Sequence, residues 1–378
     1  MAAENTMHRM LPELPKRNPI NGTFELTVRC NLHCKMCLFR HDDRENPELM
    51  AKELTAAQWI DMAGQAAKAG TLSLLITGGE PMLRPDFCEI WEGIYRLGFV
   101  TELYTNATLM SPKIMETLRK YPPHQIGITI YGVSPETYGK VCGNEIAFHQ
   151  MLDGVRQLQT LPSELSFRTT LIQENFQDAQ KIDDMVSREF GIQYKVKQAS
   201  PINKAVRGAC AKVELHRVPP EQDCAMKANR MMESIRKFVG DAFDPRKLVI
   251  KQTNSMTRKE DDSQRYSLFG CKAGMAQYTI TYDGKLLACQ MIGAFSTDAR
   301  KDGLQAAWDA YPFSVHIPET EVKCDKCTYR DTCQACYGTR YAETGDFNGC
   351  SDYMYQYAKA KKQYGNFTGG NQDEQCKI

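Results

Sequence analysis

The sequence predicts an α/β fold, in which a partial (β/α)6 parallel barrel is followed by a small cysteine-rich carboxyl-terminal domain. Strand-like and helix-like segments alternate six times between residues 22 and 205, and repeated βα units form parallel sheets with right-handed crossovers. An irregular stretch interrupted by prolines follows over residues 206–268, and seven cysteines then fall between residues 271 and 350. These changes of pattern separate the barrel from the second domain.

The length of the chain agrees with more than one domain. At 378 residues it exceeds what one hydrophobic core usually serves, since domains average roughly 150 residues. We expect an N-terminal extension over residues 1–21, the barrel over 22–205, a bridging segment over 206–268, the cysteine-rich domain over 269–365 and a flexible tail over 366–378.

The net charge and the amino-terminal residues bear on which partners and which cellular location we expect for the protein. The 47 basic and 46 acidic residues give a net charge of +1, which offers no whole-chain argument for a nucleic acid or an anionic membrane as partner. Residues 1–21 contain no apolar run, so neither a signal peptide nor a spanning helix is predicted. We expect a cytoplasmic protein whose fifteen cysteines serve metal or redox chemistry.

The first element is a strand over residues 23–29, and three cysteines follow it within eight residues, Cys30, Cys34 and Cys37. The carboxyl ends of strands are where α/β folds place their active sites. A closed structural zinc site or a complete iron–sulfur cluster takes four protein ligands, so three thiols leave one coordination position open. Taken alone, the group also fits a structural zinc loop or buried thiols.

A helix and a buried strand come next. Thr55 and Gln58 form a predicted capping box for the helix, and the strand over residues 71–77 runs into Gly78, Gly79, Glu80 and Pro81. Two glycines leave the backbone bare for the approach of a ligand, and the proline stiffens the exit. As an isolated tetrapeptide this segment equally predicts a plain turn.

The alternation then continues to the end of the barrel. We expect helices over 86–97, 112–120 and 179–190, a helix that begins at Ser134 and Pro135, and strands over 100–106, 125–131, 165–172 and 194–198. Asn106, Thr129 and Arg168 occupy strands or strand ends. Their structural interpretations are a turn residue, a threonine that fills the pleat and a solvated edge charge.

Beyond a helix predicted over 222–239, the second cysteine group begins. Asp283 and Gly284 lie between two β-rich runs and predict a hairpin, which brings Cys271 and Cys289 together. Five further cysteines follow in the order Cys324, Cys327, Cys333, Cys336 and Cys350. Paired C-x-x-C motifs also suit a zinc ribbon, although five residues between the pairs is a short gap for one.

The C-x-x-x-C-x-x-C loop after a first strand, together with Gly78-Gly79-Glu80-Pro81, resembles the radical S-adenosylmethionine (SAM) enzymes. The resemblance implies that Cys30, Cys34 and Cys37 hold a 4Fe-4S cluster whose fourth iron binds SAM, and that its reductive cleavage yields a 5′-deoxyadenosyl radical. By the same resemblance the Gly78–Pro81 motif meets the SAM amine, and Met36 stands where the family usually has an aromatic residue beside the adenine. Asn106 and Thr129 would contact the ribose, and Arg168 the carboxylate or ribose.

The carboxyl-terminal cysteines resemble the SPASM extension of radical SAM enzymes, an iron–sulfur domain with auxiliary 4Fe-4S clusters. Transferred by motif position, one set would hold an outer cluster, and it comprises Cys324, Cys327, Cys333 and Cys350. The other would hold an inner cluster, and it comprises Cys271, Cys289 and Cys336. The inner set is one thiolate short, so Cys224 or another residue supplies the fourth ligand or the position is open to substrate. Cys336 follows Cys333 after two residues, where the family usually has three.

The resemblance implies an oxidoreductase that modifies a ribosomally made peptide or protein side chain, by a crosslink, a thioether or a similar oxidation. Its partners would be the peptide substrate and an electron donor such as flavodoxin or ferredoxin. Either a separate leader-binding protein presents the peptide or the bridging segment binds it directly. Gln290 stands where sulfatase maturases have an aspartate, which disfavours that group. A small-molecule dehydrogenase or decarboxylase remains an alternative, as does a non-enzymatic iron–sulfur or zinc scaffold. No catalytic residue is identified.

Overall fold

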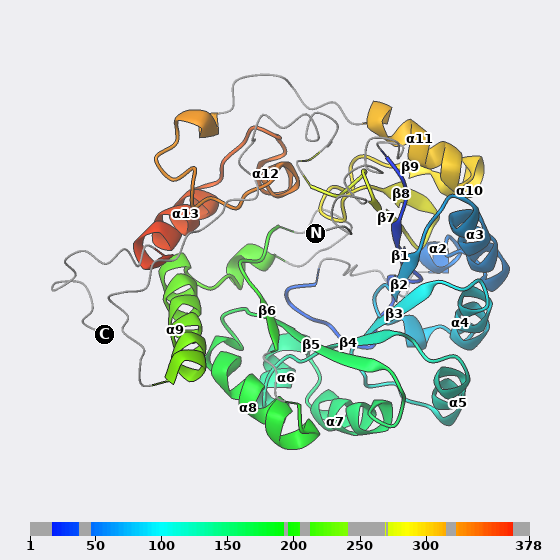
Figure 1. The fold of residues 1–378 in the computed structure, drawn as a ribbon, viewed down its shortest axis with the longest axis horizontal. Coiled ribbons are helices and arrows are strands. Elements are labelled where there is room, and N and C mark those ends of the chain that lie inside the picture. The colour runs from blue at the N-terminus through cyan, green and yellow to red at the C-terminus, as the bar shows by residue number, and fades with distance from the viewer. Residues whose placement is uncertain are drawn as a thin grey trace, which may run out of the picture.

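The computed structural model describes residues 17–37, 47–192, 196–204, 212–240, 269, 271–314 and 323–365 (Figure 1). Most of the expected extension, much of the bridging segment including Cys210, and the tail with Cys376 lie outside the described residues.

One sheet runs through the molecule, in the order β6-β5-β4-β3-β2-β1-β7-β8-β9. Its strands are β1 (Asn21–Glu25), β2 (Ser73–Thr77), β3 (Val100–Thr105), β4 (Gln125–Thr129), β5 (Glu164–Thr170), β6 (Lys197–Ala199), β7 (Gln277–Ile280), β8 (Lys285–Leu287) and β9 (Thr297–Asp298). Strands β1 to β6 are all parallel. The predicted partial (β/α)6 barrel is therefore confirmed.

Helices cover the outer side of the curved sheet (Figure 1). Those of the barrel are α2 (Pro47–Met50), α3 (Ala56–Lys68), α4 (Phe87–Tyr95), α5 (Pro112–Lys120), α6 (Pro135–Cys142), α7 (Ile146–Leu158) and α8 (Ala179–Phe190), with short 3-10 turns η1 (Pro81–Leu83) and η2 (Phe176–Asp178). The later ones are η3 (Val213–Leu215), α9 (Pro220–Val239), α10 (Ala299–Asp302), α11 (Leu304–Ser314), η7 (Lys323–Lys326), α12 (Tyr337–Thr344) and α13 (Asp352–Gly365).

Several predicted elements are confirmed in detail. Helices α5 and α8 coincide with their predicted ranges, and Thr55 and Gln58 make both hydrogen bonds of the capping box. Helix α7 was missed, although its buried residues recur at helical spacing and would have predicted it. Helix α11 was missed too, since Pro312 lies inside it.

The cysteine-rich region shares the sheet with the barrel. Strand β7 pairs in parallel with β1, with Asn21 opposite Gln277 and Phe24 opposite Ile280. Strand β8 then returns antiparallel to β7, as the Asp283-Gly284 turn predicted. The barrel's first strand is consequently flanked on both sides, by β2 and by a segment from the far end of the sequence.

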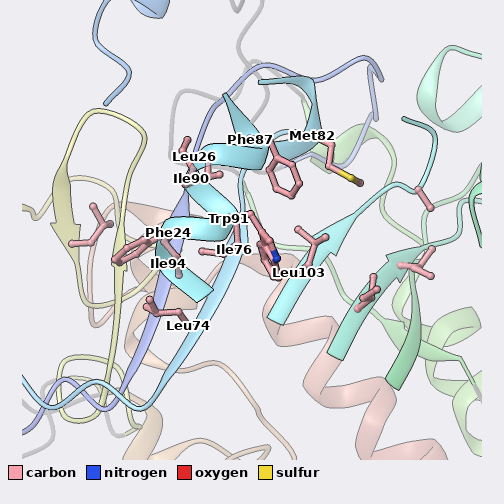
Figure 2. Close-up of a cluster of buried hydrophobic side chains, with 14 of the residues drawn as sticks. Phe24, Leu26, Leu74, Ile76, Met82, Phe87, Ile90, Trp91, Ile94 and Leu103 are labelled. Carbon is pink, nitrogen blue, oxygen red and sulfur yellow. The ribbon is translucent and has the colours of Figure 1, made fainter. Parts of the chain in front are cut away.

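Apolar side chains on the outer face of the sheet form the core with the helices. Figure 2 shows Phe24, Leu74, Ile76 and Leu103 from three neighbouring strands around Trp91 and its neighbours on α4. All four strand residues are fully buried. Because side chains alternate along a strand, the intervening residues of β1 to β5 face the inside of the barrel, where the polar side chains described below are found.

A buried ion pair makes a second connection between the barrel end and the cysteine-rich region. Arg217 binds Glu343 of α12, and the two side chains are only 7% and 2% exposed. Glu343 also accepts the backbone N–H of Lys204 at 2.8 Å, and the Arg217 guanidinium lies 4.4 Å from the ring centroid of Tyr353. The end of the barrel at Lys204 and the bridging segment at Arg217 are therefore both tied to the cysteine-rich region, through α12 and α13.

No helix among the described residues has both the length and the apolar character needed to span a membrane.

Replacing Glu343 by Gln should destabilise the fold. The substitution leaves the Arg217 charge buried without its counter-charge, which typically costs about 3 kcal/mol or more. Urea unfolding should show this loss, whereas Glu136→Gln, in an exposed ion pair with Lys140, should leave the midpoint unchanged. Equal midpoints for the two variants would contradict the role given to Glu343.

Candidate active site

The first cysteine loop leaves the carboxyl end of β1 and is supported from two sides. Residues 26–29 run beside 77–80, with the N–H of Gly79 donating to the carbonyl of Thr27 at 2.7 Å and that of Glu80 to Arg29 at 2.8 Å. On the other side, the N–H of His33 donates to the carbonyl of Cys142 at 2.9 Å. The loop is thus pinned between the end of β2 and the end of α6.

The three thiols of the loop lie near one another. Cys34 is buried, and Cys30 and Cys37 are half-buried. A hydrogen bond with Cys142 and burial hold the pKa of Cys34 well above its ordinary value, and the neighbouring Cys37 and Cys30 sulfurs add to the shift. Such mutual repulsion requires proximity, so the donor set is gathered as an iron–sulfur cluster with three protein ligands requires.

A fourth buried thiol, Cys142, adjoins this group. Its side chain is fully buried at the end of α6, with Sγ 3.1 Å from the carbonyl oxygen of Tyr138. The hydrogen bond with Cys34 lowers the pKa of Cys142. Sequence reasoning assigned Cys142 no role, because nothing local in the sequence places α6 beside the cysteine loop.

Gly78 and Gly79 are required by the close approach of two backbones. A Cβ on Gly78, whose φ is +139°, would lie 2.4 Å from the carbonyl oxygen of Thr27, and one on Gly79 would lie 2.2 Å from that of Arg29. Pro81 is the first residue of η1. The glycines therefore let the motif pack against the segment that leads into the cysteine loop, which is a different reason from the ligand approach that we expected.

The carboxylate of Glu80 is completely buried and surrounded by donors. It accepts the Asn106 N–H at 2.8 Å and the Met82 N–H at 3.2 Å, and the Thr105 hydroxyl lies 3.0 Å from both oxygens. Burial raises the pKa of Glu80 to about 7, against these hydrogen bonds, which lower it. The side chain joins the ends of β2 and β3, and the predicted contact of the motif with the SAM amine remains a prediction.

Asn106 lies beside the cysteine loop. Its Nδ2 is 3.0 Å from Oδ1 of Asn31 and 3.9 Å from Sγ of Cys30, while its Oδ1 accepts from the backbone and hydroxyl of Thr108. Met36 is buried among core side chains. The structure thus brings Asn106 to the loop, whereas its contact with ribose, like that of Met36 with adenine, is untested.

Arg168 lies inside the barrel, opposite Thr129 on the neighbouring strand. Its guanidinium carbon is 3.6 Å from the ring centroid of Tyr104, and its Nε is buried with no hydrogen-bond partner in the described part of the chain. Since β6 covers β5, the alternative of a solvated edge charge is wrong. Tyr104, which sequence reasoning missed, holds the guanidinium by a cation–π contact.

The carboxyl-terminal cysteines gather in the two sets that the resemblance implied. Burial raises the pKa of Cys350, and the nearby Cys333, Cys324 and Cys327 sulfurs raise it further. Burial likewise raises the pKa of Cys289 to about 11, with further contributions from Cys336 and Cys271. The sulfurs within each set therefore lie close to one another.

Cys224 does not join the inner set. It packs between α9 and α13 against Tyr357 and Ala360, and burial and then Asp223 raise its pKa to about 11. Cys88, on α4, lies 3.9 Å from the carbonyl oxygen of Lys113.

The spacing of the thiols differs from that of a mononuclear site. Among the described residues, no three His, Cys, Asp or Glu side chains come close enough together to hold a single metal ion.

Comparison with known proteins identifies the barrel. The model of the Radical SAM superfamily matches residues 24–186. This chain carries a radical SAM domain. As a radical SAM enzyme it uses a 4Fe-4S cluster and SAM, and its cysteine-rich carboxyl-terminal region is consistent with a SPASM domain.

Relatives of the radical SAM enzyme cover nearly its whole length. It is 25% identical over 341 residues to the AdoMet-dependent heme synthase of Methanosarcina barkeri, covering 86% of this chain and 93% of that protein. It is 24% identical over 331 residues to the PqqA peptide cyclase of Ruegeria pomeroyi, covering 83% and 82%. The solved structure of Streptococcus suis SuiB bound to S-adenosylmethionine matches with a TM-score of 0.64 at 15% identity, covering 93% of this chain and 81% of that one, which supports the fold.

Replacing Glu80 by Gln should change how stability depends on pH. Burial raises the pKa of Glu80 from 4.5 to about 7 on folding, so the folded chain binds the extra proton. The associated stability is complete below about pH 4.5 and is lost as the pH rises through 7, by on the order of 3 kcal/mol. Urea unfolding of the metal-free wild type and Glu80→Gln should be measured below pH 4.5 and above pH 7. The free energy of unfolding of the wild type, relative to that of the variant, should be lower at the higher pH. A difference between the two that does not vary with pH would contradict the assignment.

Removing two ligands of the outer set should remove one cluster. The anaerobically reconstituted wild type should bind roughly eight to twelve irons, and the double variant Cys324→Ala/Cys327→Ala should bind about four fewer. Iron and sulfide analysis measures this, with Cys88→Ala as the matched control that keeps all its iron. Zinc in place of iron, or an unchanged iron content in the double variant, would defeat the assignment.

Proposed function

We propose that this radical SAM enzyme cleaves SAM reductively and oxidatively modifies a side chain of a ribosomally made peptide or protein, forming a crosslink, a thioether or a similar product. The observation that carries the proposal is the placement of two cysteine groups about one sheet. The loop of Cys30, Cys34 and Cys37 follows the carboxyl end of β1, whereas Cys271 precedes β7 and Cys289 follows β8, at the amino end of β1. A five-residue strand is about 16 Å long, so the length of β1 separates the inner set from the loop along the sheet.

This separation gives the two sets different tasks. When bound, the 4Fe-4S cluster and SAM supply the radical chemistry that removes a hydrogen atom from the substrate. Cys30, Cys34 and Cys37 would hold that cluster, and Asn106 would help to orient it through its amide beside the Cys30 sulfur. Arg168, fixed on Tyr104 with a buried Nε to donate, would bind the SAM carboxylate or ribose.

The auxiliary sets suit a net oxidation. Each set would hold a 4Fe-4S cluster that accepts an electron from the substrate as it is oxidised. The outer set comprises Cys324, Cys327, Cys333 and Cys350, and the inner set comprises Cys271, Cys289 and Cys336. An electron donor such as flavodoxin or ferredoxin, a separate protein that binds the peptide leader and a cytoplasmic location belong to the same proposal.

A peptide substrate is supported by two of the relatives. One is named a PqqA peptide cyclase, and SuiB has also been solved with its precursor peptide SuiA. The second candidate is a small-molecule dehydrogenase or decarboxylase, and the similarity to an AdoMet-dependent heme synthase over 93% of that protein favours it.

Mass spectrometry of a reconstituted reaction separates the two candidates. Reduced enzyme with SAM and a cysteine- or aromatic-rich peptide encoded near its gene should yield deoxyadenosine and a peptide lighter by two hydrogens. Cys34→Ala, which removes a ligand of the SAM-binding cluster, should yield neither.

Two other results would decide against the peptide proposal. Unchanged peptides together with oxidation or decarboxylation of a small-molecule carboxylate would favour the second candidate. Deoxyadenosine formed equally by wild type and Cys34→Ala would argue against radical SAM chemistry altogether.

A further inference from the structure

We propose that His216, oriented by Glu174, is the base that accepts the proton released when the substrate is oxidised. This rests on the proposed function, which requires such a base. The two residues come from different parts of the chain, Glu174 from the segment after β5 and His216 from the segment after η3.

Glu174 connects His216 to the cysteine loop. Its Oε1 lies 2.5 Å from Nδ1 of His216 and 3.0 Å from Nζ of Lys35. Lys35 stands between the cluster ligands Cys34 and Cys37. The three side chains therefore form a continuous polar contact from the cysteine loop, across the carboxyl end of β5, to the bridging segment.

The backbone around His216 is fixed as a catalytic side chain requires. The N–H of Gln173 donates to the carbonyl of His216 at 2.9 Å, and the Gln173 side chain donates to the carbonyl of Arg217 at 2.8 Å. The side chain of His216 itself is 23% exposed. It is held in place while retaining access for a ligand.

The arrangement determines which ring nitrogen is basic. A carboxylate at Nδ1 fixes the proton on that nitrogen and leaves Nε2 as the acceptor. Burial alone would raise the pKa of Glu174, but the hydrogen bond from Lys35 and the contact with His216 hold it below its ordinary value. Glu174 is thus an anion that stabilises the imidazolium formed when Nε2 takes a proton.

Other charged groups beside His216 are engaged elsewhere or exposed. Arg217 is turned to Glu343, and Glu214 is exposed on η3. The second oxygen of Glu174, Oε2, is buried and has no hydrogen-bond partner in the described part of the chain.

The proposed step balances. A C–H bond and an X–H bond of the substrate break, and a C–X bond forms. One hydrogen atom goes to the radical derived from SAM, one electron goes to an auxiliary iron–sulfur cluster, and one proton goes to Nε2 of His216. The imidazolium later returns its proton to solvent, and Glu174 acts as a positioning residue throughout.

The test uses the reconstituted full-length enzyme with SAM and its peptide, and compares His216→Gln with His124→Gln. His124 is exposed and precedes β4, at the opposite end of the strands, so it receives the same chemical change away from the site. His216→Gln should form deoxyadenosine within about twofold of wild type but form product at least about 100-fold more slowly, the usual size of a general base effect. Imidazole should restore product formation to His216→Ala, and His124→Gln should behave as wild type.

A second readout does not depend on turnover. In the metal-free protein, nitrogen-15 NMR of the histidine rings should show the neutral His216 protonated at Nδ1, identified by the signal that is missing in His216→Gln. In Glu174→Gln the form of neutral His216 that is protonated at Nδ1 should no longer predominate.

The inference is overturned if His216→Gln forms product at the wild-type rate, or if it loses deoxyadenosine and bound iron together, which would make the contact a structural tie only. A proton on Nε2 in the wild type would overturn it equally. A wild type that modifies no peptide counts against the proposed function instead, and the tautomer then still decides the role of Glu174.

Discussion

The parallel pairing of β1 with both β2 and β7 is the constraint on which the arrangement of this protein depends. Phe24 of β1 is fully buried under the helices, and hydrogen bonds hold the strand on both edges. Because β1 cannot shift without breaking two ladders, the cysteine loop at its carboxyl end and the hairpin beside it are fixed relative to one another. Both cysteine groups take their positions from this one strand.

Buried charges complete the support of the cysteine loop where the β1 ladder ends. Arg84, in the segment after the Gly78–Pro81 motif, donates to the carbonyls of Leu26 and Leu54, each at 2.9 Å. Glu53 binds both Arg84 and Arg29, the residue directly before Cys30. The bond to Leu26 satisfies a carbonyl just past the end of the β1 ladder, and the bond to Leu54 ties the segment before α3 to the same guanidinium.

Local patterns predicted what depends on neighbours in sequence, and failed where distant segments meet. The βα alternation and the hairpin turn predicted the barrel and the approach of Cys271 to Cys289, because periodicity and turn chemistry act over a few residues. The resemblance predicted the two carboxyl-terminal sets of thiols. Neither showed Cys142 beside Cys34 or Glu174 beside His216, since these contacts depend on how α6 and the bridging segment dock. Tyr104 was missed for the same reason, as its partner Arg168 lies two strands away.

The wide gap in sequence between β1 and β7 affects how the chain is made. The second partner of β1 leaves the ribosome 256 positions after β1 itself, from 21 to 277. Until then the nascent barrel exposes an edge of unbonded amides and carbonyls, the kind of edge that recruits other chains into aggregates. The topology of this sheet therefore leaves one edge of β1 open until β7 has been made.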